Sequence, residues 1–174
     1  MGRVSQAQAR ENRERIVATA ARLLREKGIN GISVADVSAA AGLTHGGFYK
    51  QFESKEALVS EAIAYAFAQQ ATRLEADPTL LDGYLTPEHR DTPGTGCPAA
   101  GFAGDVARAA GGEAARQSYA DGVAAYARML GTDDEPDLAA VSMMVGALIL
   151  SRATAGTEIS EHLLAAAKQA LDER

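Results

Sequence analysis

Residues 31–58 read GISVADVSAAAGLTHGGFYKQFESKEAL, and this stretch decides the fold. Ser33 opens an S-x-x-D capping box before a short apolar helix, and Gly42 is placed to end that helix. Thr44 is expected to cap a second helix that runs through Tyr49. Helices this short cannot bury themselves alone, so they must pack on one another. The pattern therefore predicts a helix-turn-helix, whose second helix lies in the major groove of DNA.

Longer helices are predicted on both sides of this stretch. An apolar stripe at i, i+4, i+7 and i+8 predicts a helix over 10–27. Ser54 caps a helix expected to run to about Leu74, and the proline- and glycine-rich stretch 77–98 is expected to be mostly loop. Further helices are predicted at 99–110, 113–130, 136–155 and 159–171. The predicted fold class is all-α, with a three-helix DNA-binding domain over 1–54 and a helical domain over 55–174.

Charge is divided unevenly along the chain. Residues 1–55 hold nine Lys/Arg and five Asp/Glu, a balance of +4, while 56–174 hold eight and eighteen, a balance of −10. A basic first third favours local attraction to phosphates, although chance segregation of surface charge is an open alternative. No apolar run reaches the roughly 18 residues of a membrane span, and the polar amino terminus does not read as a signal peptide. A cytoplasmic protein without membrane association is expected.

Several function classes find no support in the sequence. The single cysteine, Cys97, rules out an intrachain disulfide and a cysteine-rich zinc site, so neither metal nor cofactor is expected. The three histidines, His45, His89 and His162, form no HExxH motif. The chain also carries no phosphate-binding P-loop, G-x-S-x-G or G-x-G-x-x-G motif. We therefore do not expect an enzyme.

The run 31–44, followed by 47–52 and 54–58, resembles the TetR family of bacterial transcriptional repressors. The shared elements are a helix of small residues, Ala-Gly-apolar, Phe-Tyr, a following aromatic, and Lys-Glu-x-Leu, within about residues 10–65. The resemblance implies a homodimeric repressor that a small-molecule effector, of unknown identity, releases from a palindromic double-stranded DNA operator. The alternative is a DNA-binding architectural or adaptor protein without a ligand.

The predicted DNA-contacting residues are Ser33, Thr44, His45, Gly46, Gly47, Tyr49, Lys50 and Lys55. His45 and Lys50 are best placed to contact base edges or nearby phosphates, and the resemblance gives Tyr49, Lys55 and Ser33 phosphate contacts. The two glycines each cost roughly 1 kcal/mol relative to alanine in a helix. They indicate either a frayed helix start or a backbone that approaches DNA closely.

Two further predictions concern neighbours of this segment. Phe48 and Phe52 are expected in the core rather than at the DNA. The basic arm formed by Arg3, Arg10 and Arg13 is expected to be either a DNA-contacting tail or an ordinary solvated terminus.

The 55–174 domain is expected to bind the effector and to dimerise. Candidate pocket residues, each of which could instead be plain core, are Tyr65, Phe67, Cys97, Phe102, Tyr119, Tyr126 and Met129. The resemblance implies that the last two helices pair with their copies through Val141, Met144, Val145, Leu148, Ile149, Ile159, Leu163 and Ala167; intrachain core is the alternative. Cys97 sits at an expected helix start, a setting that lowers thiol pKa. It is interpreted either as a sensor thiol or as a small buried hydrophobe.

Overall fold

A computed structural model describes residues 6–132 and 135–174, and this part of the chain contains helices but no β-strand. The prediction of an all-α fold is confirmed. The helices are α1 (Gln6–Lys27), α2 (Val34–Ala40), α3 (His45–Phe48), α4 (Lys55–Ala76), the 3-10 helix η1 (Pro78–Leu81), α5 (Pro87–Asp91), α6 (Pro98–Ala107), α7 (Gly112–Leu130), α8 (Leu138–Ala153) and α9 (Glu158–Asp172).

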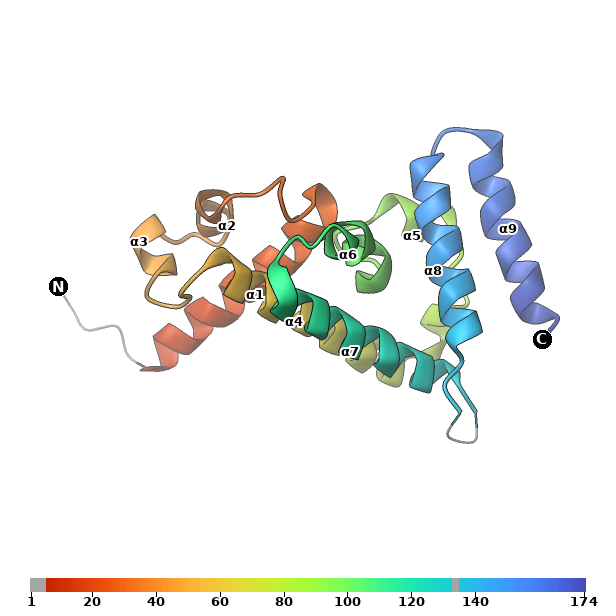
Figure 1. The fold of residues 1–174 in the computed structure, drawn as a ribbon, viewed down its shortest axis with the longest axis horizontal. Coiled ribbons are helices and arrows are strands. Elements are labelled where there is room, and N and C mark those ends of the chain that lie inside the picture. Colours follow the sequence, from red (N-terminus) through yellow and green to blue (C-terminus); the bar gives the residue numbers. More distant parts are fainter. Residues whose placement is uncertain (1–5, 133–134) are drawn as a thin grey trace.

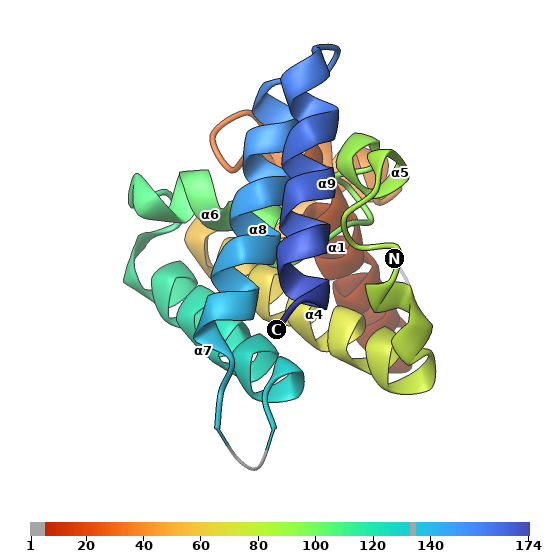
Figure 2. The same ribbon diagram turned by 90° about the vertical axis from the view of Figure 1, so that its right-hand side faces the viewer.

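The molecule is elongated, with α1, α2 and α3 at one end and α8 and α9 at the other (Figure 1). Between these ends, α4 and α7 pack along each other and form the main connection. Figure 2 shows α8 and α9 side by side, with α4 and α7 behind them. The helix-turn-helix and the paired carboxy-terminal helices are therefore joined mainly through α4 and its neighbours.

One apolar core runs through the whole length of the molecule. It begins in α1, where Ile16 and Leu24 of the predicted stripe are buried, and includes Phe48 of α3. It continues through Ile63 of α4 to Leu148 of α8. The two predicted domains, 1–54 and 55–174, thus share one continuous core. A domain boundary at 54/55 would separate the proposed DNA-binding part from the proposed effector-binding part, but it would not separate two hydrophobic cores.

The helix ends follow local signals in most places. The capping box at Ser33 is confirmed, because Ser33 Oγ accepts from the Asp36 N–H while the Asp36 carboxylate accepts from the Ser33 N–H. Gly28 ends α1 in the left-handed region, at φ +79°. At α8, Asp137 rather than Pro136 opens the helix, because its side chain accepts from the Ala140 N–H at 2.8 Å.

The stretch expected as loop contains more helix than its proline content suggested. The stretch contains η1 and α5, which are short helices. Thr86 caps α5 through the His89 N–H, and Pro87 occupies the first turn, where no N–H is needed. None of the described helices is both long enough and apolar enough to span a membrane.

Candidate nucleic-acid interface and ligand pocket

Two aromatic side chains anchor α3 to the domain. Phe48 and Phe52 are buried and stack with their ring centroids 5.5 Å apart. The Arg13 guanidinium lies 4.1 Å from the Phe52 ring centroid, a cation–π contact. The prediction that these two phenylalanines belong to the core is confirmed. With its inner side held in this way, α3 turns its remaining residues outward.

The outward surface of this segment carries most of the predicted DNA contacts. Tyr49 is 56% exposed, its ring meeting the edge of Phe48, and Thr44, Gly46 and Lys50 are exposed. His45 lies in α3, but its side chain is outside what the structure describes. This surface, Thr44–Lys50, is called the recognition face below, and it lies at the end of the molecule remote from α8 and α9 (Figure 1).

Nothing inside the chain requires glycine on the recognition face. A methyl group built on Gly46 would meet no atom within 4 Å, and one on Gly47 would lie 3.4 Å from Thr44 Oγ1. Neither residue is among the positive-φ glycines. The expected side-chain cap is missing as well, because Thr44 makes no capping hydrogen bond. Neither packing nor backbone strain within the chain explains the glycine pair.

Two predicted phosphate-binding side chains already have partners. Ser33 Oγ donates to Asp36 Oδ2 at 2.6 Å, and hydrogen bonds from Ser33 lower the pKa of the Asp36 carboxyl. A phosphate contact from this hydroxyl would therefore require it to rotate away from Asp36. Lys55 Nζ donates to the carbonyl of Ile29 at 2.6 Å, which ties the start of α4 to the α1–α2 connection. An ammonium has three N–H groups, so Lys55 retains donors for a phosphate.

The three arginines of the predicted basic arm have different surroundings. Arg13 pairs with Glu61 of α4 and donates to the carbonyl of Gln51, so it is a structural residue that braces the recognition segment. Arg10 is exposed on α1, and Arg3 lies outside the described residues. The three arginines therefore do not form one flexible arm, because the contacts of Arg13 connect α1 to α4 and to the end of the recognition segment.

The predicted pocket residues mostly pack into the core. Cys97 and Phe102 are fully buried, so the core alternative describes both. Phe67 meets Tyr119 and Tyr126 edge-on, with centroid distances of 5.8 and 5.2 Å. The Tyr119 hydroxyl donates to the Ala99 carbonyl at 2.8 Å. Tyr65 is half-buried and accepts a hydrogen bond from Gln69. Met129 is 37% exposed, and it lines a groove between α4 and α7 together with Phe67 and Tyr126.

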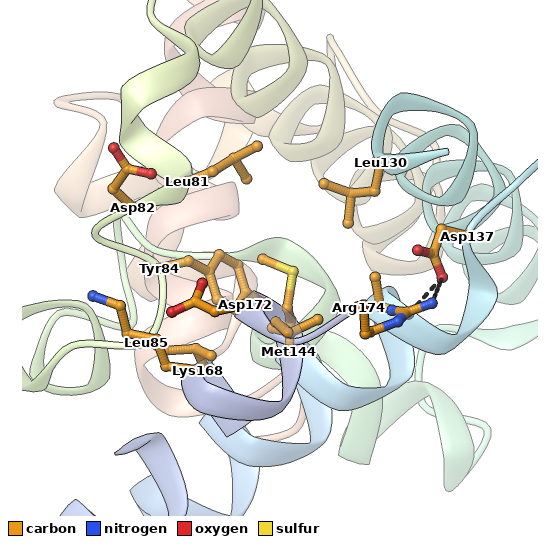
Figure 3. Close-up of a pocket in the computed structure, with 12 residues that line it drawn as sticks. Leu81, Asp82, Tyr84, Leu85, Leu130, Asp137, Met144, Lys168, Asp172 and Arg174 are labelled. Atoms are coloured by element: carbon orange, nitrogen blue, oxygen red, sulfur yellow. Dashed lines mark hydrogen bonds and ion pairs between the residues drawn. The ribbon is translucent and has the colours of Figure 1, made fainter. Parts of the chain in front are cut away.

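A larger hollow lies between α4 and the segment 79–96, where the sequence had not predicted one. It has a volume of about 490 Å³, and we call it the α4 pocket. Its lining includes Gln70, Arg73, Leu74, Leu80, Tyr84, Thr86, Glu88, His89, Thr95 and Gly96. A second hollow of about 370 Å³ opens near the end of α9. Figure 3 shows Tyr84 and Met144 in this second hollow, with the Asp137–Arg174 ion pair at its side.

Two tyrosines carry buried hydroxyl groups, and one of them, Tyr84, also lines the α4 pocket. The hydroxyls of Tyr84 and Tyr126 are inaccessible and meet no hydrogen-bond partner of good geometry among the described residues. Burial raises the pKa of both phenols and of the Cys97 thiol beside Tyr84. The expectation that the helix start lowers the thiol pKa of Cys97 is therefore corrected, because desolvation outweighs the helix amino terminus here.

His89 closes the segment 84–97 into a loop. Its Nδ1 lies 2.7 Å from the carbonyl of Tyr84, and its Nε2 accepts from the Cys97 N–H at 2.9 Å. One ring nitrogen must donate and the other accept, so the ring is neutral in this arrangement. Burial is the main cause that lowers the pKa of His89, in keeping with the neutral form.

Buried arginines link this loop to distant helices. Arg25 of α1 donates to the carbonyl of Gly96 at 2.8 Å, and Arg152 of α8 donates to the carbonyls of His89 and Arg90 at 3.0 Å. Arg90 in turn pairs with Glu161 of α9. The loop is therefore in contact with the DNA-binding end through α1 and with the paired carboxy-terminal helices through α8 and α9.

The residues predicted for the dimer interface fall into two groups. Val141, Met144, Leu148 and Ala167 are buried within the chain, so the intrachain alternative describes them. Ile159 is 51% exposed, while Val145, Ile149 and Leu163 are half-buried. Leu150, which was not predicted, is 53% exposed. The exposed apolar surface of α8 and α9 thus includes fewer of the predicted interface residues than the sequence analysis expected.

Metal binding finds no support in the described part of the chain, where no group of three or more His, Cys, Asp or Glu side chains could hold an ion.

Sequence comparison matches this chain to known proteins around the helix-turn-helix, and structural comparison matches it over nearly the whole chain. A family profile described as bacterial regulatory proteins, tetR family, matches residues 16–62. The regulator AcrR of Shigella flexneri is 36% identical over 61 residues, 35% of this chain and 28% of that protein. The repressor DhaR of Mycobacterium sp. (strain GP1) is 32% identical over 78 residues, 45% of this chain and 38% of that protein. These matches thus span well under half of the relatives' own lengths.

Two solved structures share the fold along nearly the whole chain. The reduced form of E. coli NemR superposes with a TM-score of 0.72 at 21% identity, covering 91% of this chain and 96% of that one. A TetR-family regulator from Cytophaga hutchinsonii gives 0.73 at 19% identity, covering 95% of both chains. The relatives are named as regulators, in agreement with the expectation that this chain is not an enzyme. Residues 16–62 are therefore similar to bacterial regulatory proteins of the tetR family, and the described chain shares its fold with solved structures that include a TetR-family regulator.

Proposed function

We propose that the chain is a ligand-responsive repressor that binds a palindromic operator as a homodimer. The observation that carries the proposal is the recognition face. Its inner side is fixed by Phe48 and Phe52, and its outer side presents Tyr49 and Lys50. No contact or positive φ among the described residues requires glycine at positions 46 and 47. A bare backbone beside a tyrosine and a lysine suits close approach to the edges and phosphates of DNA.

Dimerisation follows from the size of the recognition face. A single short helix reads few base pairs, and a two-fold assembly on a palindrome doubles the contacts. We assign the interface to the exposed apolar positions of α8 and α9, with Leu150, Ile159 and Leu163 at its centre. This assignment replaces the buried residues of the earlier set, because a side chain already enclosed by its own chain offers no surface to a partner.

Ligand response is supported by the α4 pocket and its connections. The Tyr126 hydroxyl is buried and meets no hydrogen-bond partner among the described residues, and the Tyr84 hydroxyl lies against the Cys97 thiol, which is a weak partner. Such buried hydroxyls are costly unless a ligand or water satisfies them, which favours a sensor over an adaptor with a collapsed core. The same loop contacts α1 through Arg25 and α8 through Arg152. A ligand that binds one arrangement of this loop more tightly than another would shift the loop toward that arrangement. The contact between the loop and α1, and with it the position of the DNA-binding end, would then change.

The proposal is tested by the binding of purified protein to a DNA fragment selected from the genome, measured by fluorescence anisotropy. Lys50→Glu places a like charge opposite the phosphates and should abolish selective binding, whereas the matched control Lys168→Glu on α9 should leave affinity unchanged. Equal loss in both variants would indicate only a general charge effect. No loss in Lys50→Glu would remove the recognition face from the interface.

A further inference from the structure

Three guanidinium groups from three different helices converge on one short piece of backbone in the α4 pocket. Arg25 of α1 donates to the Gly96 carbonyl at 2.8 Å, and Arg73 of α4 reaches the Thr95 carbonyl at 3.4 Å. A methyl group built on Gly96 would lie 3.0 Å from Arg152 Nη2 of α8. Thr95, Gly96 and Arg73 all line the pocket. This wall of the pocket therefore has a concentration of positive charge.

Nearby carboxylates compensate these charges only at a distance. Glu26 acts on Arg25 and Asp91 on Arg152, but each of the two acids forms its ion pair with another arginine, Glu26 with Arg22 at 3.0 Å and Asp91 with Arg90 at 2.7 Å. Among the described ion pairs, none involves Arg25, Arg73 or Arg152. Their hydrogen bonds go to backbone carbonyls, which are dipoles and do not neutralise a cation. Burial lowers the pKa of Arg25 and Arg152, which is the effect of desolvation on cations.

The lining of the pocket also contains apolar groups, namely Leu74, Leu80 and the ring of Tyr84, together with the amide of Gln70. The one acid in the lining, Glu88, is exposed. A ligand that fits this arrangement carries a negative charge at one end and an apolar body at the other.

We propose that the effector of this chain is a compact organic anion, a carboxylate or similar acid with an apolar body, whose charged group binds Arg73 beside Thr95 and Gly96. Arg73 is the contact residue because it is exposed to the pocket and its bond to the Thr95 carbonyl is long. Arg25 and Arg152 lie behind the wall and act through the electrostatic potential.

The proposal deepens the ligand-sensing part of the proposed function and rests on it for its regulatory meaning. When Arg73 turns to the anion, the loop keeps its bond from Arg25 and loses its bond from α4. The position of α4 relative to α1 would then depend on the ligand, which is the form of coupling that releases DNA.

The test is calorimetry on the protein alone, without DNA, so that a failure here is distinct from a failure to bind an operator. The probes are sodium benzoate, salicylate and octanoate, each paired with its neutral primary amide. At least one acid should bind at or below about 1 mM and at least about tenfold more tightly than its amide. Arg73→Gln should remove that preference, Arg73→Lys should retain part of it, and the control Arg116→Gln on exposed α7 should retain all of it.

Two outcomes would overturn the proposal. One is a wild-type protein that binds no acid at this concentration, or that binds the amides equally well. The other is an Arg73→Gln variant that binds the acid like wild type while its thermal midpoint matches that of Arg116→Gln, since the variant is then folded and the charge at Arg73 is irrelevant.

Discussion

Gly46→Ala should make the protein more stable and its DNA binding weaker. The added methyl group meets no atom of the chain within 4 Å, and Gly46 is not among the positive-φ glycines, so the folded state accepts it without strain. Alanine in place of glycine at a compatible position stabilises by about 0.4–1 kcal/mol, chiefly through the unfolded chain. For a chain of this size that corresponds to a rise in Tm of roughly 1–4 °C.

The DNA affinity should change in the opposite direction. If the α3 backbone lies against the DNA, a methyl group at Gly46 displaces the helix and weakens base contacts. Loss of one good contact costs about 1–3 kcal/mol, so affinity should fall by about 5- to 150-fold. The control is Gly104→Ala in the exposed part of α6, where the methyl group would meet the flexible Arg108 guanidinium at 3.4 Å. It should raise Tm without changing DNA affinity.

Calorimetric melting and anisotropy titration with a selected fragment measure the two effects. A Gly46→Ala protein that melts higher and binds DNA as tightly as wild type would refute the close approach of the backbone. The glycines would then mark only a frayed start of α3.

Three further predictions concern assembly, phosphate contacts and pH. Ile159→Glu should yield folded monomers in sedimentation, whereas Leu148→Glu, at a fully buried position, should unfold the chain; a dimeric Ile159→Glu protein would contradict the assigned interface. Lys55→Ala should reduce the salt dependence of DNA binding by about one phosphate contact per half-site. It should also lower Tm, because the Ile29 carbonyl loses its hydrogen-bond donor. An unchanged salt dependence would show that Lys55 has a structural role only. Burial lowers the pKa of His89, so its contribution to stability is complete above the ordinary value of about 6.5 and is lost as pH falls from there through the folded-state pKa. The free energy of unfolding should decline over that window in wild type and less in His89→Gln; equal slopes would exclude His89 as the cause.

The positions of most helices could be predicted from the sequence, because the residues that start, stop and pattern a helix lie close together along the chain. The apolar stripe of α1, the caps at Ser33 and Ser54, and the glycine stops act within a few residues of one another. The same local reading missed α5, since a run of prolines and glycines suggests loop even though Thr86 and Pro87 open a helix.

The pocket could not be predicted in the same way, because it is assembled from distant parts of the chain. Arg25, Arg73 and Arg152 come from three helices, and the burial of Arg25 runs against the usual preference of charged side chains for the surface. Aromatic residues were the natural candidates for a pocket lining, yet Phe67, Tyr119 and Tyr126 pack on one another. A sequence pattern identifies which residues are apolar, but not which of them fill the core.

The most direct test of the central claim, that Thr44–Lys50 reads operator DNA in a two-fold assembly, is a footprint on genomic DNA. Fragments retained by the purified protein would be digested in its presence, and the protected bases read. The account predicts a protected palindrome whose half-site centres lie about one helical turn apart, roughly 10 base pairs, or a multiple of that spacing. Weak protection spread evenly over all fragments, without a preferred site, would contradict it.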